Sequence, residues 1–259
     1  MKQMLIIPDK SQIQKCLELA KEYQLGFEYN DFVLPDVLDD EKLLDEIIAQ
    51  YKKEELPEYC TMHGAFFDVI PFSMDKRIRE VASLRINRSI EIARKMGVKA
   101  VVFHTNYSPF LNLEAYVKTW IDTNVGFWSQ ILEKNQDTNI YLENMFELTP
   151  DIIEQLSERL SKYNNYGVCL DWAHASLSKT APEIWAKKLG RYVKHVHIND
   201  NDLISDLHLG WGDGQLNRDT FYKCYNAYLG NATVLVETTP MENKIRSLEM
   251  LKKEGFIEN

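Results

Sequence analysis

The chain has 259 residues, 45% of them hydrophobic and 27% charged, which argues against a disordered chain or a fibrous repeat. Its formal net charge of −9 argues against a general binder of polyanions. No apolar run reaches the roughly 18 residues of a membrane-spanning helix, and the first segment is too short for a secretory signal. We therefore expect a cytoplasmic protein, in agreement with four widely spaced cysteines that form no C-x-x-C pair.

Short β-type runs alternate with longer stretches of helical periodicity along the whole chain. In chain order, the predicted strands are Met4–Ile7, Gly26–Tyr29, Tyr59–His63, Ala100–His104, Asn139–Glu143, Tyr166–Asp171, Val193–Asn199 and Thr233–Thr238. Several are apolar on both faces, as in strands covered by helices outside and by packed side chains inside. Eight such units in about 250 residues predict an α/β fold, a single (β/α)8 TIM-barrel domain spanning residues 1–259.

Local signals mark the helices between these strands. Residues Asp75–Met96 carry apolar side chains at spacings of three and four, and Gly97 follows as a stop signal. Pro150 and Pro240 begin helices after the fifth and eighth strands, because proline at a helix start loses no hydrogen bond. We find no linker or change in composition that would divide the chain.

Acidic and imidazole side chains recur at the C-terminal ends of these strands or in the loops that follow. The set is His63, His104, Glu143, Asp171, His174, His197, Asp206, His208 and Glu237. In a TIM barrel these strand ends meet at one mouth, where active sites form. Alternation along the seventh strand directs His195 and His197 inward together, with His197 nearer the mouth. We interpret the deeper His195 as a hydrogen-bonded core histidine.

Ionised carboxylates facing one cavity would repel one another, and burial alone is costly for each of them. A divalent cation would remove both problems. Mixed imidazole and carboxylate ligands suit zinc, manganese or iron better than magnesium or calcium. The spacings Asp171-x-x-His174 and Asp206-x-His208 support a metal site, although each spacing alone is common in sequences.

Several passages resemble the xylose isomerase-like superfamily, also called AP endonuclease family 2, which contains sugar and sugar-phosphate isomerases and epimerases as well as endonuclease IV. They are His63-Gly, Val102-Phe-His104, Leu142-Glu143-Asn144, Gly167-Val-Cys-Leu-Asp171-Trp-Ala-His174, Val196-His197-Ile-Asn-Asp200, Asp206-Leu-His208 and Val236-Glu237. The resemblance covers nearly the whole chain. It implies a metal-dependent enzyme with one to three zinc or manganese ions.

Position by position, the resemblance implies three neighbouring metal sites. The first comprises His63, His104 and Glu143, the second Glu143, Asp171, His197 and Glu237, and the third His174, Asp206 and His208. Epimerase-like members of the superfamily use the second site alone, whereas endonuclease IV-like members use all three. His63 and His104 could instead bind substrate through hydrogen bonds.

Two reaction classes follow from this resemblance. The first is isomerisation or epimerisation of a sugar or sugar phosphate, with Glu143 and Glu237 as the acid/base pair and His174 orienting a substrate oxygen. One departure is the stretch Asn201–Ile204, where ketose epimerases carry an arginine. The second is an endonuclease IV-like phosphoesterase acting on a small phosphoester or abasic DNA. A barrel that keeps its metal without turnover is a third alternative.

Charge patterns bear on the substrate. Residues 28–46 contain eight acidic side chains against Lys42 alone, and a mouth loop with that charge would repel duplex DNA. Residues 76–99 contain eight basic and two acidic side chains, which form either a solvated helix face or a phosphate-facing stripe. Arg77 and Arg79 are the ones expected to reach a small anionic substrate. Nucleic acid is thus disfavoured as a partner without being ruled out.

Aromatic residues are predicted in or beside the mouth loops. They are Phe66, Phe67, Phe72, Tyr107, Phe110, Trp172 and Trp211. They form either an apolar wall for a small-molecule substrate or a cover over the core. We expect Phe66, Tyr107, Trp172 and Trp211 to contact the substrate. No membrane partner is expected, and nothing in the sequence defines an oligomeric state.

Overall fold

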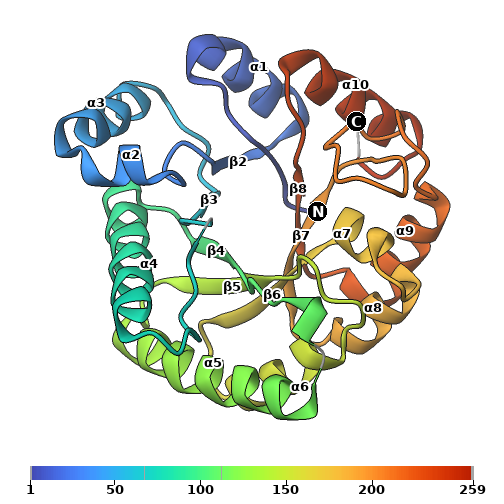
Figure 1. The fold of residues 1–259 in the computed structure, drawn as a ribbon. Coiled ribbons are helices and arrows are strands. Elements are labelled where there is room, and N and C mark those ends of the chain that lie inside the picture. The colour runs from blue at the N-terminus through green and yellow to red at the C-terminus, as the bar shows by residue number, and fades with distance from the viewer. Residues whose placement is uncertain (1, 67, 112, 258–259) are drawn as a thin grey trace.

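Eight parallel strands close into a barrel in chain order, with β8 paired to β1 (Figure 1). The computed structural model describes residues 2–66, 68–111 and 113–257. The strands are β1 (Met4–Ile6), β2 (Gly26–Tyr29), β3 (Cys60–His63), β4 (Ala100–His104), β5 (Asn139–Glu143), β6 (Tyr166–Asp171), β7 (Val193–Ile198) and β8 (Thr233–Val236). The predicted (β/α)8 barrel is confirmed, and every predicted strand is present within two residues of its expected ends.

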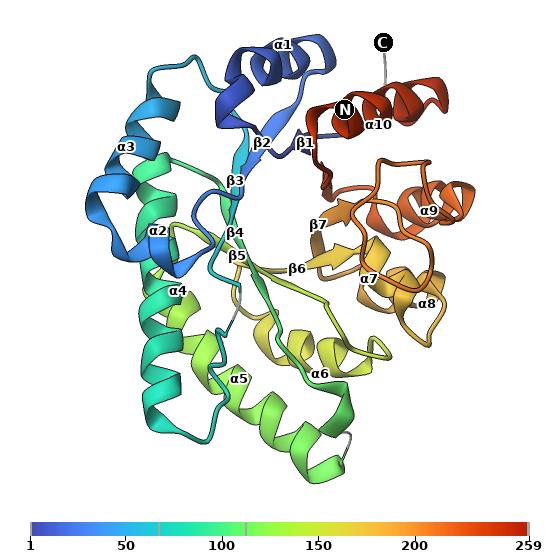
Figure 2. The same cartoon turned by 45° about the horizontal axis from the view of Figure 1, so that its top comes forward.

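Helices surround the barrel as an outer ring, visible from both directions of view (Figures 1 and 2). They are α1 (Ile13–Tyr23), α2 (Pro35–Asp39), α3 (Glu41–Lys52), α4 (Lys76–Met96), α5 (Glu114–Lys134), α6 (Asp151–Leu160), α7 (Trp172–Leu177), α8 (Pro182–Leu189), α9 (Arg218–Cys224) and α10 (Met241–Lys253). Short helical turns cover Lys10–Gln12, Pro109–Leu111 and Tyr225–Leu229. In the described part of the chain, none of these helices has the length and apolarity that a membrane crossing requires.

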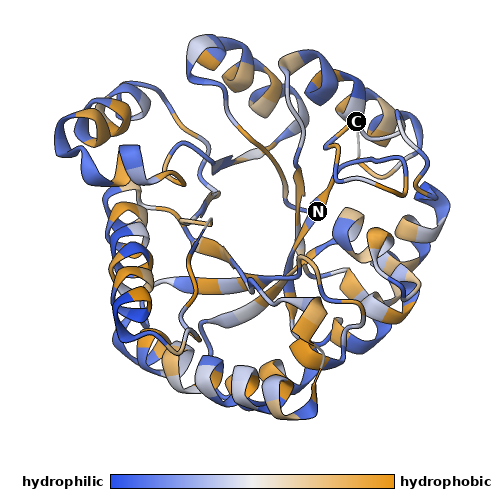
Figure 3. Ribbon diagram, in the orientation of Figure 1, coloured by the Kyte–Doolittle hydropathy of each residue, from blue (hydrophilic) through white to orange (hydrophobic). Residues whose placement is uncertain are grey.

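The helices are amphipathic, with apolar faces toward the strands and polar faces outward (Figure 3). Helix α4 illustrates the local causes. Asp75 caps its start, accepting a 2.7 Å hydrogen bond from the backbone N–H of Arg77, and Gly97 ends it with a φ of 75°. Ile86 and Ile90 of its inner face are almost fully buried. Inside the barrel, Ala100 and Val102 of β4, Tyr141 of β5 and Cys169 of β6 form a second, smaller core cluster.

The two segments of opposite charge pair with each other among the outer helices. Residues 28–46 form the end of β2 and then two helices, rather than the open mouth loop that we expected. Arg85 and Arg88 of α4 form ion pairs with Asp39 and Glu41, and Lys95 lies 3.5 Å from Asp45. Much of the basic face of α4 is therefore neutralised by α2 and α3, which fits a structural face better than a phosphate-binding stripe.

Candidate metal centre

The predicted ligand residues from strands β3 to β8 and their loops converge at the C-terminal end of the barrel. They form three groups: the first group His63, His104 and Glu143; the central group Glu143, Asp171, His197 and Glu237; and the third group His174, Asp206 and His208. Within each group the possible ligand atoms lie within 4.8 Å of one another. Glu143 belongs to two groups, so the first and central groups share one carboxylate.

In the first group, Glu143 is 1% exposed, and its Oε2 lies 3.3 Å from Nε2 of His63 and 3.5 Å from Nε2 of His104. Burial lowers the pKa of His104 to about 3, so this ring is neutral and can offer a lone pair. The first group therefore presents two imidazoles to one carboxylate oxygen.

In the central group, Nδ1 of His197 lies 3.4 Å from both Oε1 of Glu143 and Oε2 of Glu237. Asp171 is fully buried, and its Oδ1 accepts a 2.6 Å hydrogen bond from the backbone N–H of His174, at the start of α7. The other oxygen, Oδ2, has no hydrogen-bond partner among the described residues. Strand ends β5, β6, β7 and β8 thus aim four side chains at one buried point.

In the third group, Oδ2 of Asp206 lies 3.2 Å from Nε2 of His174 and 3.1 Å from Nε2 of His208. Burial alone would lower the pKa of His208, but Asp206 and Glu237 raise it to about 10. This group is more exposed than the other two, since Asp206 lies in the long connection after β7. It is the part of the centre closest to solvent.

Three of these histidines are oriented by backbone carbonyls. Nδ1 of His63 lies 2.9 Å from the Gly64 carbonyl, Nδ1 of His174 lies 2.8 Å from the Asn144 carbonyl, and Nδ1 of His208 lies 3.2 Å from the carbonyl of Glu237. A carbonyl can only accept, so each Nδ1 carries a hydrogen, and Nε2 is the nitrogen that faces the group and could bind a cation once it has lost its proton. Metal-binding histidines in proteins are usually held in this way.

Glu28 is a buried member of the centre that the sequence analysis did not identify. This residue of β2 is fully buried, and its two oxygens lie 3.1 Å from Nε2 of His197 and 3.1 Å from Nε2 of His195. The hydroxyl of Thr61 donates a 2.6 Å hydrogen bond to it. Its inward position on a predicted strand was the available signal, but we counted it with the acidic segment that follows.

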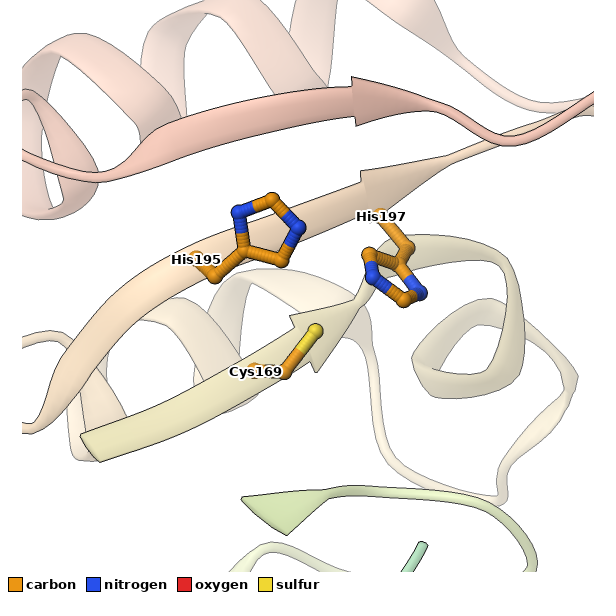
Figure 4. A group of neighbouring side chains, drawn as sticks. All are labelled: Cys169, His195 and His197. Atoms are coloured by element: carbon orange, nitrogen blue, oxygen red, sulfur yellow. The ribbon is translucent and has the colours of Figure 1, made fainter. Parts of the chain in front are cut away.

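His195 and His197 project from β7 to the same side, toward Cys169 of β6 (Figure 4). Nδ1 of His195 lies 2.5 Å from the hydroxyl of Thr233, so this ring is hydrogen-bonded below the central group, as we interpreted it. Burial raises the pKa of the Cys169 thiol well above its ordinary value. Both ring nitrogens of His195 already lie next to partners, Nδ1 next to the Thr233 hydroxyl and Nε2 next to Glu28, so we describe this deeper cluster as polar packing.

The charge and the unpaired atoms of the central group fit a cation. Burial raises the pKa of Asp171 to about 7, and the nearby carboxylates of Glu143 and Glu237 add to the shift. Oδ2 of Asp171, Oε2 of Glu237 and Nδ1 of His197 are buried without a hydrogen-bond partner among the described residues. Ligands about 2.1 Å from a tetrahedral ion lie roughly 3.4 Å apart, which matches the two 3.4 Å separations around Nδ1 of His197.

The predicted substrate-contacting arginines lie at the start of α4. Arg77 is exposed, whereas the guanidinium of Arg79 donates hydrogen bonds of 2.7 and 2.9 Å to the carbonyls of Ser73 and Met74. Arg79 therefore braces the loop before α4. The ring of Phe66 lies 4.8 Å from that of His63, beside the first group.

The other predicted aromatic contacts divide into two kinds. Trp172 and Trp211 are each 1% exposed, and both rings pack 5.2 Å from Phe221 of α9, so they cover the core rather than face the mouth. Tyr107 packs on Trp120 and also lines a pocket beside the third group. Phe72 packs on the same tryptophan. Phe67 lies outside the described residues.

Known proteins share this architecture. An uncharacterized protein of Methanocaldococcus jannaschii, MJ1311, is 28% identical over 222 residues, which are 82% of this chain and 73% of that protein. A D-tagatose 3-epimerase-like protein has a TM-score of 0.75 at 24% identity, with 98% and 96% of the two chains covered. Endonuclease IV from Thermus thermophilus has a TM-score of 0.63 at 15% identity, with 97% of each chain covered.

At these identities the solved structures establish the fold alone. The family profile described as a xylose isomerase-like TIM barrel matches residues 17–254, which is most of the sequence. The chain therefore belongs to the xylose isomerase-like TIM barrel family.

Proposed function

We propose that the protein is a divalent-metal-dependent isomerase or epimerase that acts on a sugar or a sugar phosphate. The central group carries this proposal, because two buried carboxylates from β5 and β8 approach the same imidazole nitrogen at 3.4 Å. Its mixture of imidazole and carboxylate suits zinc or manganese. The likeness to a D-tagatose 3-epimerase-like protein agrees with this reaction class.

A divalent ion held by the central group would polarise a carbonyl and a neighbouring hydroxyl, which acidifies the C–H bond between them. Glu143 and Glu237 are placed to accept and return that proton. Burial alone would raise the pKa of both carboxyls, but the positive charge of protonated His197 lowers it; a cation held by the central group would act in the same direction and keep both carboxylates ionised. His174, fixed on the Asn144 carbonyl, is placed to orient a substrate oxygen.

Phosphoester hydrolysis is the second candidate, and the sharing of Glu143 between two groups favours it. A carboxylate that bridges neighbouring cations is typical of multinuclear centres, which stabilise both the attacking and the leaving oxygen of an in-line displacement. The third group would extend such a centre. The likeness to endonuclease IV agrees with this alternative.

Metal stoichiometry and two activity assays distinguish the candidates. About one equivalent of zinc or manganese, with deuterium exchanged from heavy water into candidate ketoses, supports the isomerase. Three equivalents, with nitrophenol released from bis(4-nitrophenyl) phosphate and no exchange, support the hydrolase instead.

Two variants sharpen this comparison. Glu143→Gln should abolish turnover in either scheme, and normal activity in this variant would contradict both. His208→Ala should leave an isomerase nearly unchanged, because the central group remains intact, whereas a hydrolase that needs the third group should lose its activity. Asp75→Asn, a change at the exposed cap of α4, is the control for both variants.

A further inference from the structure

A mainly apolar pocket of about 570 Å³ opens beside the third group. We call it the apolar pocket; its walls include Tyr107, Phe110, Met145, Phe146, Leu148 and Leu177. His174 and Asp206 of the third group line the same pocket, so a ligand there lies next to the candidate metal centre. The volume falls in the range of small-molecule binding sites, roughly 300–1,000 Å³.

Two phenylalanines at this pocket are unusually exposed. Phe110 is 95% exposed and Phe146 is 58% exposed, and they come from different connections, one after β4 and the other after β5. These two apolar rings lie on separate loops and line one pocket. A ligand that covered them would remove apolar surface from water, which favours binding. The core does not use these rings, in contrast to the nearly buried Trp172 and Trp211.

The charged residues that line the apolar pocket disfavour an anionic ligand. Among the described residues that line it there is no lysine or arginine, while Asp206 and Glu147 are both present. Glu147 is 2% exposed, accepts a 2.8 Å hydrogen bond from the backbone N–H of Met145, and is also bonded to the hydroxyl of Thr105. The one imidazole that lines the pocket, that of His174, is already paired with Asp206 at 3.2 Å, so a phosphate in this pocket would meet carboxylates without a free basic side chain.

We infer that the part of the substrate distant from the reacting atoms is an uncharged, apolar group about the size of a ring, bound in the apolar pocket. Given the proposed function, the substrate is then a sugar whose metal-binding carbonyl and hydroxyl oxygens are joined to an apolar substituent, and it is not a sugar phosphate. The polar oxygens lie toward the candidate metal centre, and the apolar substituent lies against Phe110 and Phe146.

The first experiment tests the pocket without metal or turnover. Methyl NMR of the metal-free protein, labelled at methionine and leucine, is followed during titration with benzyl alcohol and, separately, glycerol 3-phosphate. Benzyl alcohol should shift the methyl signals of Met145, Leu148 and Leu177 in a saturable way, and glycerol 3-phosphate should not. Phe146→Ala should weaken the binding of benzyl alcohol at least fivefold. Tyr228→Ala removes an exposed ring outside the pocket and should leave this binding unchanged. Absence of the benzyl alcohol shifts, or stronger shifts from glycerol 3-phosphate, would overturn the inference.

The second experiment joins the pocket to the metal centre. Benzohydroxamate and acetohydroxamate share a metal-chelating head and differ in their tails. On the zinc-loaded protein the benzo compound should bind about tenfold more tightly, and this ratio should fall toward one in Phe146→Ala but persist in Tyr228→Ala. Equal affinities would mean that the tail of a ligand bound at the metal centre does not enter the apolar pocket, which would overturn the inference.

If neither hydroxamate bound the zinc-loaded protein, the proposed metal-dependent function would fail. The NMR titration would still decide whether the apolar pocket accepts a neutral ring.

Discussion

Replacing Asp171 by asparagine should stabilise the metal-free protein above neutral pH and weaken the metal-loaded one. Asp171 is fully buried, and burial together with the carboxylates of Glu143 and Glu237 raises its pKa from 3.8 to about 7. Asparagine keeps the oxygen that accepts from the backbone N–H of His174 at the start of α7, and it removes the charge.

The magnitude follows from linkage between proton binding and folding. When a carboxyl has a higher pKa in the folded state than in the unfolded state, proton binding favours the folded state. This contribution to stability is complete only below the pKa of the unfolded state. That stability is lost as pH rises from about 4 to about 7. A shift of about three units corresponds to roughly 4 kcal/mol, an upper value for a site that water can reach. The variant should gain up to this amount at pH 8 and about 1 kcal/mol or less at pH 4.5.

Urea denaturation at both pH values, in the presence of a chelator, measures the difference in the free energy of unfolding. Excess zinc should cancel this gain at pH 8, because an ion present at a thousand times its Kd stabilises the wild-type fold by about 4 kcal/mol, and a still larger excess should reverse the order. Asp75→Asn at the exposed cap of α4 is the matched control and should change little at either pH. The reasoning is refuted if the chelated Asp171→Asn protein is less stable than wild type at pH 8.

Further substitutions test the surroundings of the centre. Glu28→Gln should lower the affinity for zinc about 10- to 100-fold, because the ring of His197 loses the carboxylate that orients it. Competition with a chromophoric chelator measures the Kd for zinc. An unchanged Kd would contradict an orienting role for Glu28. Gly64→Ala should destabilise the protein by about 1–3 kcal/mol, since the added methyl would lie 2.2 Å from the ring of Phe103. Gly126→Ala, with nothing within 4 Å of the added methyl in α5, should instead stabilise it by about 0.5–1 kcal/mol in the same denaturation assay, and a loss there would contradict the packing argument.

The strands, and the meeting of the candidate ligand residues at one end of the barrel, could be predicted because they depend on local pattern and on one property of the fold. Runs such as Ala100–His104 are apolar and end in a polar side chain, and a parallel barrel brings such ends together. Side-chain alternation then placed Glu143 and His197 on the inner surface. The division of these residues into three groups was instead taken from the resemblance to the xylose isomerase-like superfamily.

Other features depend on contacts that sequence spacing does not reveal. Glu28 meets His197 across the barrel interior from β2 to β7, which are not neighbouring strands, so no pairing register relates the two residues. Trp172 begins α7 and turns toward Phe221 of α9, although its position after β6 equally allowed a place in the mouth. The charge runs likewise gave no sign that Arg85 pairs with Asp39.

Closure of the barrel by β8 also affects when an ion could be acquired. β8 lies between β7 and β1, and the connection after it supplies Glu237, the last of the predicted ligands in chain order. During synthesis His63 leaves the ribosome long before Glu237, so a nascent chain exposes isolated imidazoles on an open sheet, where a cation would be held weakly. If the protein binds an ion as proposed, tight binding would therefore follow translation of the eighth strand.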